Sequence, residues 1–426
     1  MQTKLLEKYK LSELGEQADS ILRKCVHCGF CLATCPTYDL LGNELDSPRG
    51  RIYQIKQVLE GQKPTEKTRT HLDRCLTCRN CETTCPSGVE YAHLLDAGRH
   101  IVEQQVPRSF SQRALRRTLR TVLPHRKRIT PLVKLGQAFA PLLPATLRSH
   151  LPPKQKAGLW PDARHERTML VLDGCVQPSM GPNINAAAAR VLDRIGISLI
   201  GIREAGCCGA LSYHLNAQEE GLNFARANID AWWPHIDNGA EAIVMTASGC
   251  GVFVTEYGDM LKHDKQYADK ARKISELCKD ISEIVAAEKT DQLQVSSDQS
   301  IAFHPPCTLQ HGQKKLGSTE SLLNAIGFDL VPVKDAHFCC GSAGTYSILQ
   351  KDLSEKLRDR KISALKKNKP DVITTANIGC LLHLQSAAEE TPVMHWVELL
   401  DRSLSAQSSQ AIQAADQSGS VINRSS

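Results

Sequence analysis

Residues 25–36 read CVHCGFCLATCP, and the same arrangement returns fifty residues later as CLTCRNCETTCP, residues 75–86. Each copy has the pattern Cys-x2-Cys-x2-Cys-x3-Cys-Pro. Thiolates with this spacing are typical ligands of [4Fe–4S] cubes. Zinc sites use pairs of cysteines separated by a longer gap, so the two runs favour iron–sulfur clusters over a zinc-bound scaffold.

The two runs are expected to share their ligands, because in runs of this kind the fourth cysteine ligates the other cluster. We therefore predict two [4Fe–4S] clusters, the first held by Cys25, Cys28, Cys31 and Cys85, and the second held by Cys75, Cys78, Cys81 and Cys35. The insert between the runs contains SPRGR (residues 47–51). This layout resembles the helical ferredoxin domain of succinate dehydrogenase-like iron–sulfur subunits.

A second duplication contains eight further cysteines. The first copy consists of Cys175, then Cys207 and Cys208 followed by glycine, then Cys250; the second copy consists of Cys307, then Cys339 and Cys340 followed by glycine, then Cys380. Sixteen of the 17 cysteines fall into the four groups. The remaining one, Cys278, lies in the helix-like stretch ISELCKDISEIV, and we predict no function for it.

Short apolar segments alternate with helical patterns around this second duplication. The expected strands are 168–172, 197–202 and 242–246 in the first copy, and 301–303, 330–333 and 372–375 in the second. The expected helices are 183–194, 218–233, 318–326 and 352–366. Such alternation predicts parallel α/β lobes, and ligand sites of open α/β sheets lie at the carboxyl ends of the strands. The cysteines follow the strands, so each lobe is expected to gather its cysteines at one site.

The predicted fold class is multidomain α+β and α/β. A mainly helical two-[4Fe–4S] ferredoxin domain (1–103) is followed by a basic, Pro-rich connector (104–165) and two repeated cysteine-rich lobes (166–290 and 298–402). Residues 403–426 are rich in Ser, Gln and Ala and are expected to be a disordered tail.

The Cys…Cys-Cys-Gly…Cys pattern resembles the cysteine-rich CCG domain of heterodisulfide reductase-like proteins. That family ends the motif with Cys-x2-Cys, whereas Ala247 and Asn377 stand three residues before the last cysteine of the two copies. Each lobe thus has four cysteines, which could hold an iron–sulfur cluster, a redox-active dithiol or another metal, or be structural thiols. His304 and His311 flank Cys307. His304 could support that site indirectly or only hydrogen-bond in a turn.

Charge is concentrated in the connector. The chain has a formal net charge of +6, yet residues 104–161 contain twelve Lys and Arg and no Asp or Glu. This stretch could meet an anionic membrane surface or an acidic partner, or be a solvated linker. Nucleic-acid binding is not expected, because exposed aromatics are not interleaved with the basic residues.

Several function classes are disfavoured by the sequence. The charged start (residues 1–22) does not read as a secretory signal, and no run of about 18 apolar residues is present. The cysteines are therefore expected in a reducing cytoplasm, where metal binding is favoured over disulfides. No dinucleotide fingerprint, Walker A motif, H-E-x-x-H motif or serine nucleophile elbow occurs. We expect electron transfer, with the organic substrate site on another chain and no catalytic residue assigned here.

Up to about residue 402 the chain resembles the iron–sulfur subunits of bacterial glycolate oxidases. The resemblance is carried by the two ferredoxin runs and by EAGCCGALSYHLNAQE, ASGCGVFVTEYG and CCGSAGTY…TANIGC. It implies a glycolate dehydrogenase complex in which FAD-bearing partner subunits oxidise glycolate to glyoxylate. Electrons would pass through this subunit to a membrane quinone, with the complex peripheral on the cytoplasmic face of the inner membrane.

Related subunits of lactate and glycerol-3-phosphate dehydrogenases share the cysteine layout, so the cysteines alone do not identify the substrate. A heterodisulfide reductase-like thiol or disulfide enzyme, with its site in the CCG lobes, is a further alternative. The amino-acid sequence of the segments between the cysteines favours glycolate as the substrate.

Overall fold

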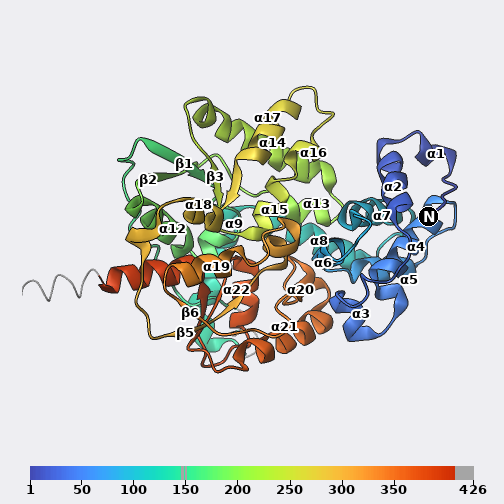
Figure 1. The fold of residues 1–426 in the computed structure, drawn as a ribbon. Helices are drawn as coiled ribbons and strands as arrows, with labels where there is room; N and C mark the ends of the chain where they lie inside the picture. The colour runs from blue at the N-terminus through green and yellow to red at the C-terminus, as the bar shows by residue number, and fades with distance from the viewer. Residues whose placement is uncertain (145–147, 149–150, 408–426) are drawn as a thin grey trace, which may run out of the picture.

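The computed structural model describes residues 1–144, 148 and 151–407. A helical N-terminal part lies at one end of the molecule, and two α/β lobes lie beside each other at the other end (Figure 1). The predicted fold class is confirmed: a cysteine-rich helical region is followed by two small parallel sheets covered by helices.

The helical part is built from short helices around one apolar core. Its elements are α1 (Glu7–Lys10), α2 (Glu13–Lys24), α3 (Pro36–Leu41), η1 (Glu44–Asp46), α4 (Pro48–Leu59), α5 (Glu66–Asp73), α6 (Asn80–Thr83) and α7 (Tyr91–Gln105). Helices α4 and α7 pack closely because Gly98 of α7 faces Ile55 of α4: a Cβ at Gly98 would lie 2.6 Å from Ile55 Cγ1. Leu22, Leu94 and Leu95 complete the centre of this core.

The connector forms two amphipathic helices, α8 (Phe110–Val122) and α9 (Arg126–Ala138), and the short η2 (Ala140–Leu142). It is tied to the helical part by Arg108, whose buried guanidinium donates to Asp73 at 2.6 and 3.0 Å and to Glu103 at 2.7 and 2.8 Å. Burial alone would raise the pKa of Asp73, but hydrogen bonds and charge from Arg108 lower it. Arg108 therefore holds the connector to the helical part and is not part of the charged surface of the connector.

The first lobe contains a parallel sheet in the order β2-β1-β3-β4. Its strands are β1 (Arg167–Val171), β2 (Ile197–Gly201), β3 (Ile243–Met245) and β4 (Cys278–Asp280). Its helices are α11 (Gln177–Met180), α12 (Asn183–Arg194), α13 (Ala210–His214), α14 (Gln218–Asp237), α15 (Ser248–Val254), α16 (Tyr257–Met260), α17 (Ala268–Leu277) and α18 (Ile281–Ala287).

The second lobe repeats this order as β6-β5-β7-β8, again with all strands parallel. Its strands are β5 (Ser300–His304), β6 (Asp329–Leu330), β7 (Val372–Thr375) and β8 (Val393–His395). Its helical elements are η3 (Thr290–Leu293), η4 (Thr308–Gly312), α19 (Ser318–Ala325), α20 (Tyr346–Leu349), α21 (Lys351–Lys366) and α22 (Ile378–Gln385), and residues 396–407 are also helical.

Three local predictions are wrong. Cys278 is not helical but begins β4, because α17 ends at Leu277 and a capping box formed by Asp280 and Glu283 starts α18. The strand expected over 330–333 ends at Leu330, since Pro332 has no amide hydrogen for the ladder. Residues 403–407 of the expected tail are helical, and Leu404 is buried. Residues 408–426 of that tail lie outside the described part of the chain.

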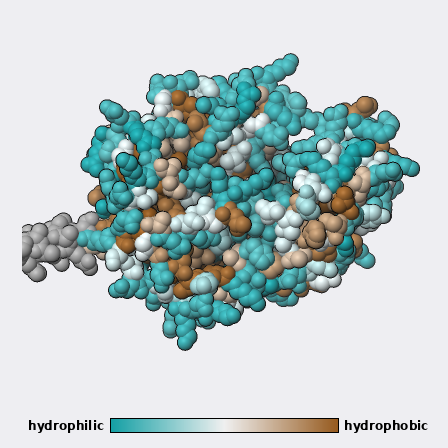
Figure 2. Space-filling view, in the orientation of Figure 1, coloured by the Kyte–Doolittle hydropathy of each residue, from teal (hydrophilic) through white to brown (hydrophobic). Residues whose placement is uncertain are grey.

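One apolar core joins the two lobes. It contains Ile184 and Val191 from α12, Phe303 from β5, and Trp396 and Leu400 from the final helical stretch. The backbones also meet where β3 and β7 end, since Ser248 N donates to Ala376 O at 3.2 Å. The two lobes thus form one packed body. Figure 2 shows a mostly hydrophilic outer face with smaller hydrophobic areas.

Replacing Trp396 with alanine tests this shared core. The side chain is fully buried, so Trp396→Ala is expected to lower the free energy of unfolding by about 3–5 kcal/mol through the cavity it leaves. Urea denaturation under anaerobic conditions measures the change. Leu316→Ala is the control, because Leu316 is 72% exposed and its truncation should cost no more than about 0.5 kcal/mol. Equal shifts in the two variants would contradict a common core.

Candidate functional site

The first of two adjoining cavities in the helical part is lined by Cys25, Cys28, Cys31 and Cys85, and Cys81 also reaches its wall. The loop after α2 coils around this cavity through left-handed backbone at His27 (φ 57°) and Gly29 (φ 90°). Cys28 is exposed, and its neighbours Val26 and Phe30 are also more than half exposed. This cavity therefore reaches the surface of the molecule.

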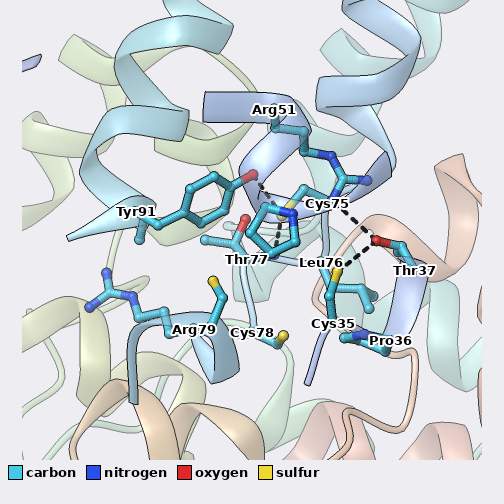
Figure 3. A pocket seen from close by; sticks show the side chains of 13 residues that line it. Cys35, Pro36, Thr37, Arg51, Cys75, Leu76, Thr77, Cys78, Arg79 and Tyr91 are labelled. Atoms are coloured by element: carbon cyan, nitrogen blue, oxygen red, sulfur yellow. Dashed lines mark hydrogen bonds between the residues drawn. The ribbon is translucent and has the colours of Figure 1, made fainter. Parts of the chain in front are cut away.

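The second cavity is lined by Cys35, Cys75, Cys78 and Cys81 (Figure 3). Its loop repeats the left-handed conformation at the matching positions, Thr77 (φ 54°) and Arg79 (φ 60°). Cys75 Sγ accepts hydrogen bonds from Thr77 N at 3.4 Å and from Tyr91 Oη at 3.6 Å, and Cys35 Sγ lies 3.3 Å from Thr37 Oγ1. Each predicted four-cysteine set thus lines one cavity.

A buried arginine stands beside the second cavity. Arg51 is fully buried, and its guanidinium donates to His71 O at 2.7 Å, Thr37 Oγ1 at 3.1 Å and Asp46 Oδ1 at 3.4 Å. Burial alone would lower the pKa of Arg51, but the nearby Cys75 and other acidic groups raise it. The guanidinium is therefore a permanent positive charge next to the cysteines of this cavity.

The donor set of the two cavities fits an iron–sulfur group. Burial raises the pKa of Cys31 to about 11 and the pKa values of Cys78 and Cys81 well above their usual range. Crowded, desolvated thiols of this kind lose their protons only when a cation takes their charge, and thiolates are the soft ligands that iron–sulfur clusters use.

In the first lobe the four cysteines form a chain of neighbours at the carboxyl end of the sheet. Cys175 contacts Cys207, Cys207 contacts Cys208, and Cys208 contacts Cys250. Hydrogen bonds from Cys207 and Cys250 lower the pKa of Cys208 well below its usual range. The backbone supports the pair, since Gly209 N donates to Cys207 Sγ at 3.4 Å.

The second lobe arranges its cysteines in the same order but in a different environment. Cys307 Sγ lies 3.7 Å from Cys339 Sγ, and Cys340 contacts Cys380. Asn377, which stands where the longer motif has a cysteine, donates from Nδ2 to Cys380 Sγ at 3.4 Å. The four cysteines of each lobe therefore come together, as the sequence predicts.

Lys361 gives the second site a buried cation. Its Nζ donates to Asp335 O at 2.7 Å, in the loop that leads to Cys339. Burial lowers the pKa of Lys361 to about 8, although the charges of Cys340 and Cys339 oppose this shift. In the first lobe the uncharged Asn228 has the comparable place and donates to Cys207 O at 2.9 Å.

The two histidines near Cys307 differ in their surroundings. His311 links the second lobe to the helical part: its Nδ1 lies 3.0 Å from Thr83 Oγ1, and its Nε2 donates to His337 O at 3.0 Å. His304 instead ends β5 and lies beside Cys340 and Cys380. Burial lowers the pKa of His304 well below its usual range.

The helical part and the second lobe meet at their cysteines. Cys78 packs with Cys307 and Cys339 in one buried cluster that also contains Tyr346. Tyr346 Oη donates to Arg74 O at 3.1 Å, and Asn80 Nδ2 donates to His337 O at 3.1 Å across the same junction. We refer to this contact as the cysteine junction. The first lobe is attached separately, through the Arg79–Glu256 ion pair and the contact of His214 with Asp96.

Sequence patterns missed the roles of Arg51, Tyr91 and Lys361. Arg51 lies in the segment SPRGR between the two cysteine runs, and its position there is the only local signal. Tyr91 and Lys361 have the sequence context of ordinary helical residues. Their neighbours in the sequence do not indicate that they lie close to cysteines in the folded chain.

Comparison with known families matches the same three regions. Residues 21–89 match a 4Fe-4S dicluster domain, and residues 169–255 and 301–385 each match a cysteine-rich domain called CCG. Together with the clustered thiols, these matches define an iron–sulfur protein with one dicluster domain and two cysteine-rich domains.

Whole-chain relatives then identify the family. The chain is 58% identical over 405 residues to the glycolate oxidase iron-sulfur subunit of Escherichia coli (strain K12), covering 95% of this chain and 99% of that protein. It is 32% identical to the probable glycolate oxidase iron-sulfur subunit of Bacillus subtilis (strain 168), over 89% of this chain and 92% of that protein. The chain belongs to the family of glycolate oxidase iron–sulfur subunits.

More distant similarities are shorter or concern the fold alone. Lactate utilization protein A of Bacillus licheniformis is 23% identical over 53% of this chain and 96% of that protein. The crystal structure of a hypothetical protein from Helicobacter pylori has a similar fold, with a TM-score of 0.56 and 10% identity over 92% of this chain and 73% of that one.

Removing the buried guanidinium tests its importance to the helical part. Arg51→Met leaves the Asp46 carboxylate buried with one partner fewer, so we expect the free energy of unfolding to fall by about 3–5 kcal/mol. Arg23→Met is the control, because Arg23 is 60% exposed in its side chain and its pair with Asp19 should contribute less than about 1 kcal/mol. Urea titration measures the free energy of unfolding of both variants. A loss for Arg51→Met as small as that of Arg23→Met would show that the buried guanidinium does not stabilise the helical part.

Proposed function

We propose that this chain is the electron-transfer subunit of a flavin-dependent glycolate dehydrogenase complex. The main support is that eight thiols line two adjoining cavities, with Cys81 in the walls of both. Cys78 of the second cavity also belongs to the cysteine junction. The family relationship to glycolate oxidase subunits supports the choice of substrate.

Each cavity is proposed to hold one [4Fe–4S] cluster. The first would be ligated by Cys25, Cys28, Cys31 and Cys85, and the second by Cys35, Cys75, Cys78 and Cys81. When bound, such clusters accept and release one electron at a time. We propose that the eight cysteines of the two lobes are further metal-binding or redox-active thiols: Cys175, Cys207, Cys208, Cys250, Cys307, Cys339, Cys340 and Cys380.

The residues of the chain set the conditions for this transfer. The donors Thr77 N and Tyr91 Oη at Cys75, with the charge of Arg51, favour the more negative state at the second cavity and so raise its reduction potential. The first cavity has no comparable fully buried cation among its lining residues. This difference favours electron flow from the outer cavity to the inner one.

The partner chains are proposed to do the organic chemistry. FAD on partner subunits would remove two electrons and two protons from glycolate to give glyoxylate, and the electrons would enter at the exposed Cys28 side. A membrane quinone would receive the two electrons with two protons, which balances the reaction. No residue of this chain is assigned to glycolate itself.

Single cysteine replacements test the cluster assignment and the electron path together. In the anaerobically purified complex, Cys28→Ser and Cys35→Ser should each remove about four irons per chain. Glycolate-dependent reduction of a soluble quinone should fall by about 100-fold, while glycolate still bleaches the flavin absorbance. Iron analysis, electron paramagnetic resonance and stopped-flow absorbance provide the three readouts.

Cys278→Ser is the matched control, because Cys278 is buried outside both cavities and should leave iron content and quinone reduction unchanged. Unaltered quinone reduction in Cys28→Ser or Cys35→Ser would contradict the proposed path. A colourless wild-type protein that contains zinc in place of iron would contradict the cluster assignment.

We also propose that the connector docks the complex on the cytoplasmic face of the inner membrane. Leu132, Leu135, Phe139 and Leu142 recur every three or four residues along α9 and η2, and all are at least half exposed. Exposed basic residues, including Lys134, flank them. An exposed apolar stripe with a basic surround is typical of helices that lie in the membrane interface. In the described residues, no helix has the length and apolar character needed to cross a bilayer.

Vesicle co-sedimentation tests this docking. Binding to vesicles of phosphatidylcholine with anionic phosphatidylglycerol should weaken at high salt, since each basic residue near the surface contributes about 1 kcal/mol. Leu135→Ser and Phe139→Ser should each weaken binding about tenfold, because each removes an apolar side chain from the interface. Leu316→Ser, an exposed site in the second lobe, is the control. Binding that ignores both salt and anionic lipid would rule out this role for the connector.

A further inference from the structure

The imidazole of His304 is buried with neither nitrogen satisfied. The residue is 1% exposed at the end of β5, and neither Nδ1 nor Nε2 has a hydrogen-bond partner among the described residues. A buried polar group without a hydrogen-bond partner destabilises the folded protein. A ligand that binds the imidazole would remove this destabilisation.

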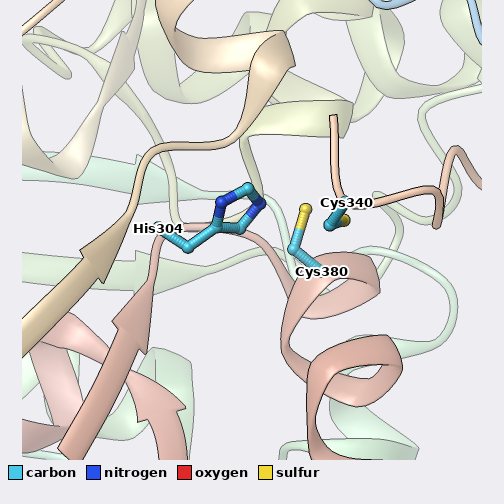
Figure 4. A group of neighbouring side chains, drawn as sticks. All are labelled: His304, Cys340 and Cys380. Carbon is cyan, nitrogen blue, oxygen red and sulfur yellow. The ribbon is translucent and has the colours of Figure 1, made fainter. Parts of the chain in front are cut away.

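The free nitrogens lie beside two thiols. One ring nitrogen of His304 and the sulfur atoms of Cys340 and Cys380 all lie within 4.8 Å of one another, and all three residues are buried (Figure 4). In a tetrahedral zinc site, with Zn–S of about 2.3 Å and Zn–N of about 2.0 Å, two sulfur ligands lie about 3.8 Å apart and a sulfur and a nitrogen about 3.5 Å apart. The three side chains can therefore close on a single ion if their ligand atoms approach one another by about 1 Å.

We propose that His304, Cys340 and Cys380 bind one divalent metal ion of the zinc type. One imidazole and two thiolates suit zinc among the common metal ions, and a tetrahedral ion would take water as its fourth ligand. The ion would tie together the end of β5, the Cys-Cys-Gly loop and the start of α22, with Asn377 Nδ2 orienting Cys380 Sγ.

This arrangement divides the four cysteines of the second lobe into two pairs. Cys340 and Cys380 face His304, whereas Cys307 and Cys339 face Cys78 at the cysteine junction. Zinc does not change its oxidation state, so the ion would hold the Cys339–Cys340 loop in place without carrying electrons. The first lobe has Leu172 three residues before Cys175, where the second lobe has His304 before Cys307, and it therefore lacks this ligand.

X-ray absorption at the zinc edge, with metal analysis of the full chain in its complex, tests the proposal. We expect about one zinc ion per chain, with one imidazole and two sulfur ligands in the scattering pattern. His304→Leu, which installs the residue of the first lobe, should lose this zinc while the iron of the helical part remains. His304→Cys should retain the ion and show one more sulfur ligand and no imidazole.

His395→Gln is the control for removing a buried imidazole from the same lobe. His395 is fully buried, but its Nε2 donates to Thr246 O at 2.8 Å, so this variant should keep the zinc. Three outcomes would overturn the proposal: wild-type protein without the ion, a zinc spectrum without imidazole, or equal zinc in wild type and His304→Leu. Iron and sulfide at this site that depend on Cys380 but not on His304 would overturn it as well.

Discussion

The packing of Cys78 against Cys307 and Cys339 fixes how the two halves of the chain are arranged. Cys78 lies in the loop of Cys75–Cys81, whose backbone is left-handed at Thr77 and Arg79, and this loop brings its thiol against the second lobe. The same loop, including Cys78, lines the second cavity. One short segment therefore contributes both to a cysteine-lined cavity and to the contact that joins the two halves.

Much of the fold could be predicted because the relevant signals are local. The helix α12 has the predicted bounds, and β7 does as well, since apolar periodicity and flanking turn residues act within a few positions. The strand at Cys278 was missed because three residues between two helical patterns give no periodicity. The Asp280-x-x-Glu283 capping box was the signal that could have separated the helices.

The candidate site also has features that the sequence predicted and features that it did not. Spacing identified the four groups of cysteines, and the known exchange of the fourth cysteine between such runs predicted which of them line each cavity. Arg51, Lys361 and the cysteine junction could not be predicted, since each depends on residues that meet only after folding. The two lobes also differ more than their cysteines suggest: Asn228 and Lys361 have comparable places, yet only one can carry a charge beside its thiols.

The shared core of the lobes has a consequence for how electrons could move. Trp396 and its neighbours make the first and second lobes a single rigid unit, and the cysteine junction attaches the helical part to that unit directly. Some redox proteins swing a carrier domain between distant docking positions, and such a motion would here require exposing buried apolar surface. Electron transfer along the proposed route would therefore need no domain rotation, and it should not slow in a viscous medium that retards such rotation.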